Sequence, residues 1–200
     1  MQTITYFYSA HSAFAYLGSA HLNKIVADAN CTIIHKPIDL DRCVAAGGAA
    51  GFNQRTQAHV DYYFGQEINR WSEYRHAPVL GRIPTHHAND PALANGMLIA
   101  AELQGLSIDA LAHEFLQAHW RDDADLANSK TLIKVAESAG YDPQPLLDAA
   151  STQAVLDVYA ANTDEAIACS VFGSPTYFVN DEMFYGQDRL GFVERALANQ

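Results

Sequence analysis

The turn Ser9-Ala10-His11-Ser12-Ala13-Phe14 lies where a strand pattern gives way to a helical one. At a helix N-terminus, unpaired backbone N–H groups and the helix dipole stabilise an anion such as a thiolate. A dithiol redox protein of thioredoxin type would carry two cysteines in this turn, but Ser12 and Ala15 occupy those positions. Ser12 instead offers a hydroxyl group that can donate a hydrogen bond to a thiolate supplied by a ligand. Ser12 is also a favourable N-cap residue, and on turn chemistry alone capping is the simpler explanation.

Two segments near the C-terminal end also have features of a ligand site. Gly173-Ser174-Pro175-Thr176 places a proline at the first position of an expected strand, where it is tolerated. Phe184 to Arg189 opens the last expected helix, in which Gly186 permits close backbone approach and Asp188 can accept from a ligand ammonium group. The structural alternatives are an ordinary loop-to-strand proline and an acid that complements the helix dipole.

The composition argues against several classes of function. The formal net charge is −11, from 23 acidic and 12 basic side chains, which disfavours binding to nucleic acid or to an anionic membrane surface. No stretch reaches the roughly 18 apolar residues of a membrane span, and the N-terminus lacks the pattern of a secretory signal. We therefore expect a soluble, cytoplasmic protein. Cys31, Cys43 and Cys169 have neither redox nor zinc-ligand spacing and are interpreted as buried or incidental thiols.

Hydrophobic periodicity predicts the elements that position these segments. Residues 2–8 and 31–35 are β-branched or aromatic runs with a helical pattern between them. From residue 37 to about 172 the pattern is helical, with expected N-caps at Ser107, at 128 or 129, and at Thr163. Strand character returns at 175–179 and 182–185, and a final helix is expected from about 187 to 198.

The resulting order of elements is β-α-β, a helical block, then β-β-α. It predicts an α/β protein with a thioredoxin-like, DsbA-type sheet and a large all-helical insertion. Residues 1–36 and 173–200 are expected to form the thioredoxin-like part and residues 37–172 the insertion, within one domain. In thioredoxin-like folds the proline equivalent to Pro175 is cis and directs the preceding backbone toward the active turn, but the sequence alone leaves the isomer open.

At this point two motifs resemble a known family. Ser12 to Leu17 reads S-A-F-A-Y-L, which resembles the S-P-[FY]-S-Y-L signature of 2-hydroxychromene-2-carboxylate isomerases and the related kappa-class glutathione transferases. Val171 to Leu190 resembles the V-F-G-V-P-T and D-E-M-[FW]-W-G-N/Q-D-R-L motifs of the same family. Asn69-Arg70-Trp71 fits as well, so the resemblance spans nearly the whole chain.

The resemblance implies a glutathione-dependent isomerase. The family interconverts 2-hydroxychromene-2-carboxylate and trans-o-hydroxybenzylidenepyruvate: the glutathione thiolate adds to a conjugated double bond, the single bond rotates, and elimination restores alkene and thiolate. The implied catalytic group is Ser12, which hydrogen-bonds the glutathione sulfur. The other implied glutathione contacts are Asn53, Ser174, Pro175, Tyr185, Gly186, Gln187 and Asp188. The family also implies a small aromatic or electrophilic second substrate and a homodimer.

Departures from the family pattern concern the second substrate more than glutathione. Ala13 replaces the usual proline and Ala15 a serine, which changes the shape of the turn without removing the Ser12 donor. Arg55 and His59 lie where the family often has a lysine.

Other residues are candidates for the pocket of this second substrate. Adjacent side chains such as His86 and His87 point to different sides in most backbones, which argues against a joint metal site. Their loop is either an ordinary surface loop or part of the pocket. His11 either tunes the thiolate and covers the pocket or is a surface histidine. The aromatic candidates are Phe14, Tyr62, Tyr63 and Trp71.

Two other functions are compatible with these motifs. A kappa-type glutathione transferase or peroxidase would use the same thiolate site but would consume glutathione. A non-catalytic DsbA-like protein would bind peptides, which the missing cysteine pair permits. The Gly186-Gln187-Asp188-Arg189 segment argues against the peptide binder, which has no need of a γ-glutamyl pocket.

Overall fold

A four-stranded sheet with the order β2-β1-β3-β4 forms the centre of the computed structural model, which describes residues 2–49, 51 and 54–199. β1 (Thr3–Tyr8) pairs in parallel with β2 (Thr32–Pro37). The helix α1 (Ala13–Ala29) connects the two strands. On its other side β1 pairs antiparallel with β3 (Thr176–Val179), which forms a hairpin with β4 (Glu182–Tyr185). The predicted β-α-β and β-β elements are confirmed.

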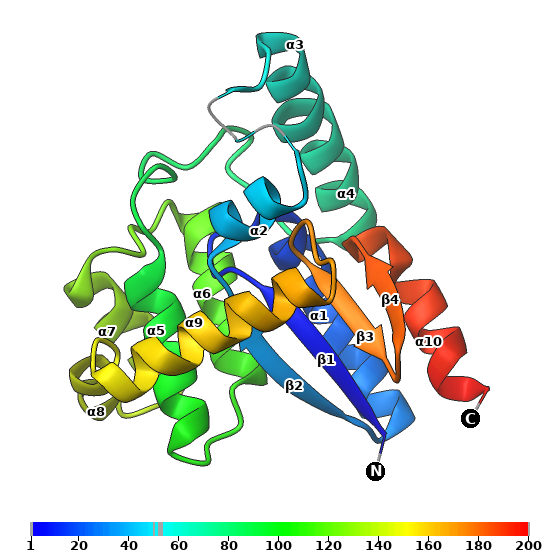
Figure 1. Ribbon diagram of the computed structural model, residues 1–200. Helices are drawn as coiled ribbons and strands as arrows, with labels where there is room; N and C mark the ends of the chain where they lie inside the picture. The colour runs from blue at the N-terminus through cyan, green and yellow to red at the C-terminus, as the bar shows by residue number, and fades with distance from the viewer. Residues whose placement is uncertain (1, 50, 52–53, 200) are drawn as a thin grey trace.

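Between β2 and β3 the described residues form helices and loops but no strand, which confirms the all-helical insertion (Figure 1). The helices are α2 (Leu40–Ala46), α3 (Gln57–Val60), the π-helix η2 (Asp61–Glu67), α4 (Ile68–Arg75), α5 (Ala92–Leu103), α6 (Asp109–Asp122), α7 (Ser129–Ser138), α8 (Pro143–Ala149) and α9 (Gln153–Ala168). After β4, the 3-10 turn η3 (Gln187–Arg189) leads into α10 (Leu190–Ala198). The exact division at residues 36/37 and 172/173 stays a prediction.

The two faces of the sheet are covered by different helices because side chains alternate along each strand. Ile4, Tyr6 and Tyr8 of β1 belong to the main core together with residues of α1, α5, α6 and α10. Phe7, between them, packs in a second cluster with Ala166 of α9. In Figure 1, α9 accordingly crosses in front of the sheet, whereas α1 runs behind it. The Ser12 turn leaves the end of β1 between these two layers.

Two of the predicted helix caps are wrong. α6 begins after Ile108, one residue later than a Ser107 cap would require, and the backbone carbonyl of Ser107 accepts from the Tyr141 hydroxyl at 2.7 Å. Thr163 lies inside α9, where it is fully buried and its hydroxyl accepts from the backbone N–H of Asp39 at 3.0 Å. The third cap is confirmed, since the Asn128 side chain accepts from the first N–H groups of α7.

Neither a membrane-spanning helix nor a disulfide bond is present among the residues that the structure describes. None of their helices combines the length and the apolar character needed to cross a bilayer. The three cysteines are free, with Cys31 and Cys43 buried and Cys169 exposed.

Candidate active site

Ser12 lies between β1 and α1, is almost completely buried, and makes two hydrogen bonds. Its Oγ accepts from the Ala15 N–H at 3.3 Å, as an N-cap does, and donates to the carbonyl oxygen of Ser174 at 3.2 Å. The capping role is therefore confirmed. The second bond brings together two predicted segments that are far apart in the sequence. The Ser174–Pro175 peptide bond is cis, which answers the question that the sequence left open.

The helical insertion holds the Ser12 turn in position. The fully buried Asn95 of α5 accepts from the Ala10 N–H at 2.9 Å and donates to Ser9 Oγ at 3.3 Å. From α6, Trp120 Nε1 donates to the carbonyl oxygen of His11 at 2.9 Å. Sequence reasoning missed Asn95 and Trp120. A polar Asn95 inside an otherwise apolar helix was the available signal.

Two cavities adjoin at Ser174 and share the rings of Phe14, Tyr63 and Tyr185. The first, the Ser12 cavity, has a volume of about 270 Å³, and the second, the Asp188 cavity, about 250 Å³. Polar side chains of the Ser12 cavity are Ser12, His11, Arg55, His59 and His87. The Asp188 cavity is lined by Glu67, Trp71, Gly186, Gln187, Asp188 and Arg189. Of the predicted residues, Ser12, Ser174, Tyr185, Gly186, Gln187 and Asp188 line one or both cavities, whereas Pro175 is not among the described lining residues.

Three of the four aromatic candidates line these cavities. Phe14 and Tyr63 border both, and Trp71 borders the Asp188 cavity. Tyr62 is not among the described lining residues of either cavity; it is 45% exposed and packs against the Tyr63 ring. Consecutive side chains of a helix point in different directions, so Tyr62 and Tyr63 do not face the same cavity.

Gln187 is fixed by Arg75, a residue that the sequence analysis did not single out. Arg75 Nε donates to Gln187 Oε1 at 3.1 Å, and Arg75 Nη2 donates to the Gln187 carbonyl oxygen at 3.1 Å. The guanidinium also lies over the rings of Trp71 and Tyr74. Gln187 is 1% exposed, so these bonds orient a side chain that has little freedom to move.

Two glycines allow the close approaches that shape the site. At Gly173 an added Cβ would lie 2.4 Å from the Tyr185 ring, so the ring fills the space that a side chain would need. Gly186 has φ 101°, which other residues adopt only with strain, and its N–H donates to the Pro175 carbonyl oxygen at 2.9 Å. Gly173 thus leaves room for the Tyr185 ring at the Ser12 cavity, and Gly186 allows the backbone conformation at the Asp188 cavity.

The Asp188 carboxylate is suited to a cationic ligand group. Its side chain is 38% exposed and lies 3.2 Å from Arg189, so it retains access to the cavity that it borders. Exposed pairs of this kind are weak, and a ligand ammonium group can compete for the carboxylate.

Burial holds two histidines of the Ser12 cavity, His11 and His87, in the neutral form. Burial lowers the pKa of His11 to about 4, helped by the proximity of His119. Burial lowers the pKa of His87 to about 3, with further contributions from His11 and His119. His11 is therefore a cavity residue rather than a surface histidine, and it adds no positive charge beside Ser12 at neutral pH.

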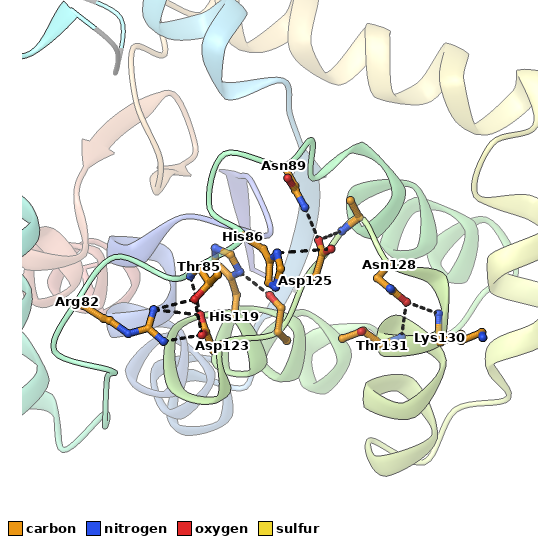
Figure 2. Close-up of polar contacts among 12 residues, drawn as sticks. Arg82, Thr85, His86, Asn89, His119, Asp123, Asp125, Asn128, Lys130 and Thr131 are labelled. Atoms are coloured by element: carbon orange, nitrogen blue, oxygen red, sulfur yellow. Dashed lines mark hydrogen bonds and ion pairs between the residues drawn. The ribbon is translucent and has the colours of Figure 1, made fainter.

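The loop that carries His86 and His87 is anchored to the segment after α6 (Figure 2). The Asp123 carboxylate accepts from the side chains of Arg82 and Thr85, and the Asp125 carboxylate accepts from Asn89 at 3.0 Å. His86 faces Asp125, 3.8 Å away, while His87 enters the Ser12 cavity. The two histidines point to different sides, as predicted, and the loop forms part of the pocket.

Arg55 and His59 both line the Ser12 cavity. Asn53 lies outside the described residues, so its predicted contact stays a prediction. No cluster of three or more histidine, cysteine or acidic side chains suited to a metal ion is found in the described part of the chain. A larger open hollow of about 850 Å³ runs along β4 and α10, but it borders neither Ser12 nor Ser174.

The fold and this site define a class of protein. A family model for DSBA-like thioredoxin domains matches residues 3–198, and the chain belongs to that family.

More specific similarities are to one kind of enzyme. The chain is 29% identical to the 2-hydroxychromene-2-carboxylate isomerase of Pseudomonas sp. (strain C18), over 97% of this chain and 89% of the relative. It is 25% identical to that of Sphingobium xenophagum, over 98% of both chains. A solved 2-hydroxychromene-2-carboxylate isomerase superposes with a TM-score of 0.82 at 26% identity, covering 98% of this chain and 95% of the other. A probable DsbA oxidoreductase from Streptomyces coelicolor, at 15% identity and a TM-score of 0.80, shares the fold, covering 100% of this chain and 89% of the other.

Proposed function

We propose that this protein is a glutathione-dependent isomerase of the 2-hydroxychromene-2-carboxylate isomerase type. The observation that carries the proposal is the Ser12 hydroxyl, held at the N-terminus of α1 and directed at the Ser174 carbonyl where two cavities adjoin. The similarity to isomerases over nearly the whole chain supports the reaction class. The structure supports the cofactor by the fit of its residues to a γ-glutamyl peptide.

The Asp188 cavity fits the peptide part of glutathione. The Asp188 carboxylate suits the ammonium group of the γ-glutamyl residue, with Gln187 fixed beside it by Arg75. Gly186 and Ser174 would offer backbone groups to the cysteinyl part, and Tyr185 forms a wall common to both cavities. When bound, glutathione supplies a thiolate that adds reversibly to a conjugated double bond and so permits its rotation.

Ser12 has one hydroxyl proton and therefore a choice of acceptor. In this structure the proton goes to the Ser174 carbonyl oxygen. Donation to a thiolate requires that this bond be given up, which leaves the Ser174 carbonyl available to an N–H of the ligand. The N-terminus of α1 stabilises the same negative charge, as helix N-termini do for reactive thiolates. One rotation of the hydroxyl would thus prepare both contacts.

The Ser12 cavity fits a small aromatic carboxylate as the second substrate. Its walls include Phe14, Phe64 and Phe172, and Arg55 borders it. Aromatic walls suit a planar ring, and a guanidinium group suits a carboxylate. The cytoplasmic location and the homodimer stay predictions.

The test is isothermal titration with reduced glutathione, together with the ultraviolet absorbance of the thiolate. Wild type should bind glutathione and show the thiolate band at neutral pH. Ser12→Ala should lose the band while retaining most of the binding, because the γ-glutamyl contacts remain. Absence of binding at millimolar glutathione would refute the cofactor assignment. Steady consumption of glutathione with turnover would instead indicate a transferase.

A further inference from the structure

A hydrogen-bonded chain of histidines leads from the segment after α6 to the Ser12 cavity, and its proton positions can be derived. His119 Nδ1 lies 2.9 Å from the carbonyl oxygen of Ala124, which can only accept, so this nitrogen carries a proton. Burial lowers the pKa of His119, so the ring is neutral and its Nε2 is an acceptor. His87 Nδ1, 3.0 Å from His119 Nε2, must therefore be the donor.

The other ring nitrogen of His87 is then left as an unprotonated acceptor. A neutral imidazole with a proton on Nδ1 has a lone pair on Nε2. In the described part of the chain, this nitrogen has no hydrogen-bond partner, and it is not one of the fully buried polar atoms without partners. His87 borders the Ser12 cavity and is only partly buried. A hydrogen-bond acceptor thus lies in the same cavity as the Ser12 hydroxyl.

The surroundings fix the His87 ring in this orientation. It stacks on His119 with centroids 5.3 Å apart, and it contacts the Trp120 ring at 5.2 Å and the His11 ring at 5.2 Å. The loop itself is anchored through Asp123 and Asp125 (Figure 2). A side chain held by packing on several sides and by one hydrogen bond is preorganised for a ligand.

We propose that His87 Nε2 accepts a hydrogen bond from a hydroxyl group of the second substrate, which makes His87 a specificity-determining residue. This proposal rests on the proposed function. A 2-hydroxychromene-2-carboxylate is a cyclic hemiketal. The 2-hydroxyl of this closed form and the phenolic hydroxyl of the open form are both donors from which an unprotonated ring nitrogen can accept.

Binding of stable probes tests the hydrogen bond without glutathione. 2-Hydroxycinnamate and cinnamate have the same ring and carboxylate and differ in one hydroxyl. Titration of wild type should show about tenfold tighter binding of 2-hydroxycinnamate, the value of one good hydrogen bond. His87→Phe should bind the two probes equally. His87→Gln keeps an acceptor and should keep most of the preference. His86→Gln is the matched control, because His86 faces Asp125, and should behave as wild type.

Turnover of the same variants tests the same hydrogen bond on the substrate. With glutathione supplied, His87→Phe should raise KM about tenfold with a smaller change in kcat, whereas His87→Gln, which keeps an acceptor, should stay close to wild type. The proposal is overturned if wild type does not distinguish the probes or binds neither, if His87→Phe keeps the preference, or if His87→Gln loses it entirely. Should His87→Phe not fold, His87→Leu replaces it in both measurements. Failure of the glutathione assignment would appear separately, as turnover independent of glutathione with the probe preference intact.

Discussion

The Ser12 hydroxyl donates to the carbonyl oxygen of Ser174 at 3.2 Å, although the two residues lie at opposite ends of the sequence. Ser12 begins α1, and Ser174 precedes the cis-proline before β3. The bond joins the two halves of the thioredoxin-like fold at the junction of the Ser12 and Asp188 cavities. A thiolate placed there would replace the carbonyl as acceptor.

Substitution Ser12→Ala separates the capping role of this hydroxyl from its proposed catalytic role. Loss of the cap should cost about 1 kcal/mol of unfolding free energy. Loss of the donor to the thiolate should lower the isomerisation rate by about 100-fold or more. The matched control is Asn128→Ala, which removes the side-chain cap of α7 (Figure 2). It should cost similar stability and leave the rate unchanged. Equal rates for Ser12→Ala and wild type would show that Ser12 is a cap only.

Arg75 should act as a positioning residue for glutathione. Arg75→Met removes two hydrogen bonds to Gln187 and leaves the buried amide oxygen without its donor. We expect about tenfold weaker glutathione binding, with kcat at saturating glutathione nearly unchanged, because a hydrogen bond to a charged group contributes about 1.5–3 kcal/mol. The control is Arg42→Gln, which breaks an exposed ion pair with Asp164 on another part of the surface. A fall in kcat without a change in glutathione affinity would contradict this role.

Much of the fold was predictable because it depends on local patterns. The runs at 2–8 and 31–35 became β1 and β2, and Asn128 caps α7 as its type suggests. The cap expected at Ser107 failed because α6 begins one residue later, and the cap expected at Thr163 failed because its hydroxyl pairs with the N–H of Asp39, which is distant in sequence. Local patterns have no access to such partners.

The site, like the fold, has some residues that local sequence identifies and others that only long-range contacts reveal. The motif residues Ser12, Ser174 and Asp188 were identified from their sequence context, and all three border the cavities. Arg75 and Asn95 were missed because their importance lies in long-range bonds to Gln187 and to the Ser9–Ala10 backbone. The sequence also could not show whether His87 lies in a surface loop or in the pocket. The position of this loop depends on its hydrogen bonds to Asp123 and Asp125, which follow α6.

Gly173 should be intolerant of a side chain because of Tyr185. An added Cβ would lie 2.4 Å from the Tyr185 ring and displace it from both cavities. We expect Gly173→Ala to weaken glutathione binding about tenfold or more, measured by titration. Gly191→Ala is the control: its Cβ would meet nothing within 4 Å, and in α10 it should raise stability by roughly 0.5–1 kcal/mol. Unchanged glutathione affinity in Gly173→Ala would contradict the role of the Tyr185 ring.

The anchor of the His87 loop should weaken in acid. Hydrogen bonds from Arg82 and Thr85 hold the pKa of Asp123 well below its usual range. A carboxyl with a lowered folded-state pKa stabilises the fold fully above its unfolded pKa of about 4, and this contribution is lost as the pH falls through the folded value. Asp123→Asn should therefore be less stable than wild type at pH 7, and the difference should narrow below about pH 4.

Urea midpoints of wild type and Asp123→Asn measured across this range test that dependence. At neutral pH the same variant should also lose part of the preference for 2-hydroxycinnamate over cinnamate, because the loop positions His87. A stability difference that is constant with pH would show that Asp123 does not anchor the loop as an ionised group.

The most direct test of the central claim is the rate of isomerisation of trans-o-hydroxybenzylidenepyruvate as a function of glutathione concentration, with total reduced glutathione measured before and after many turnovers. We predict a rate that is negligible in glutathione-free protein, saturates with glutathione and leaves its amount unchanged. A rate independent of glutathione, or the loss of one glutathione for each substrate molecule converted, would contradict the account.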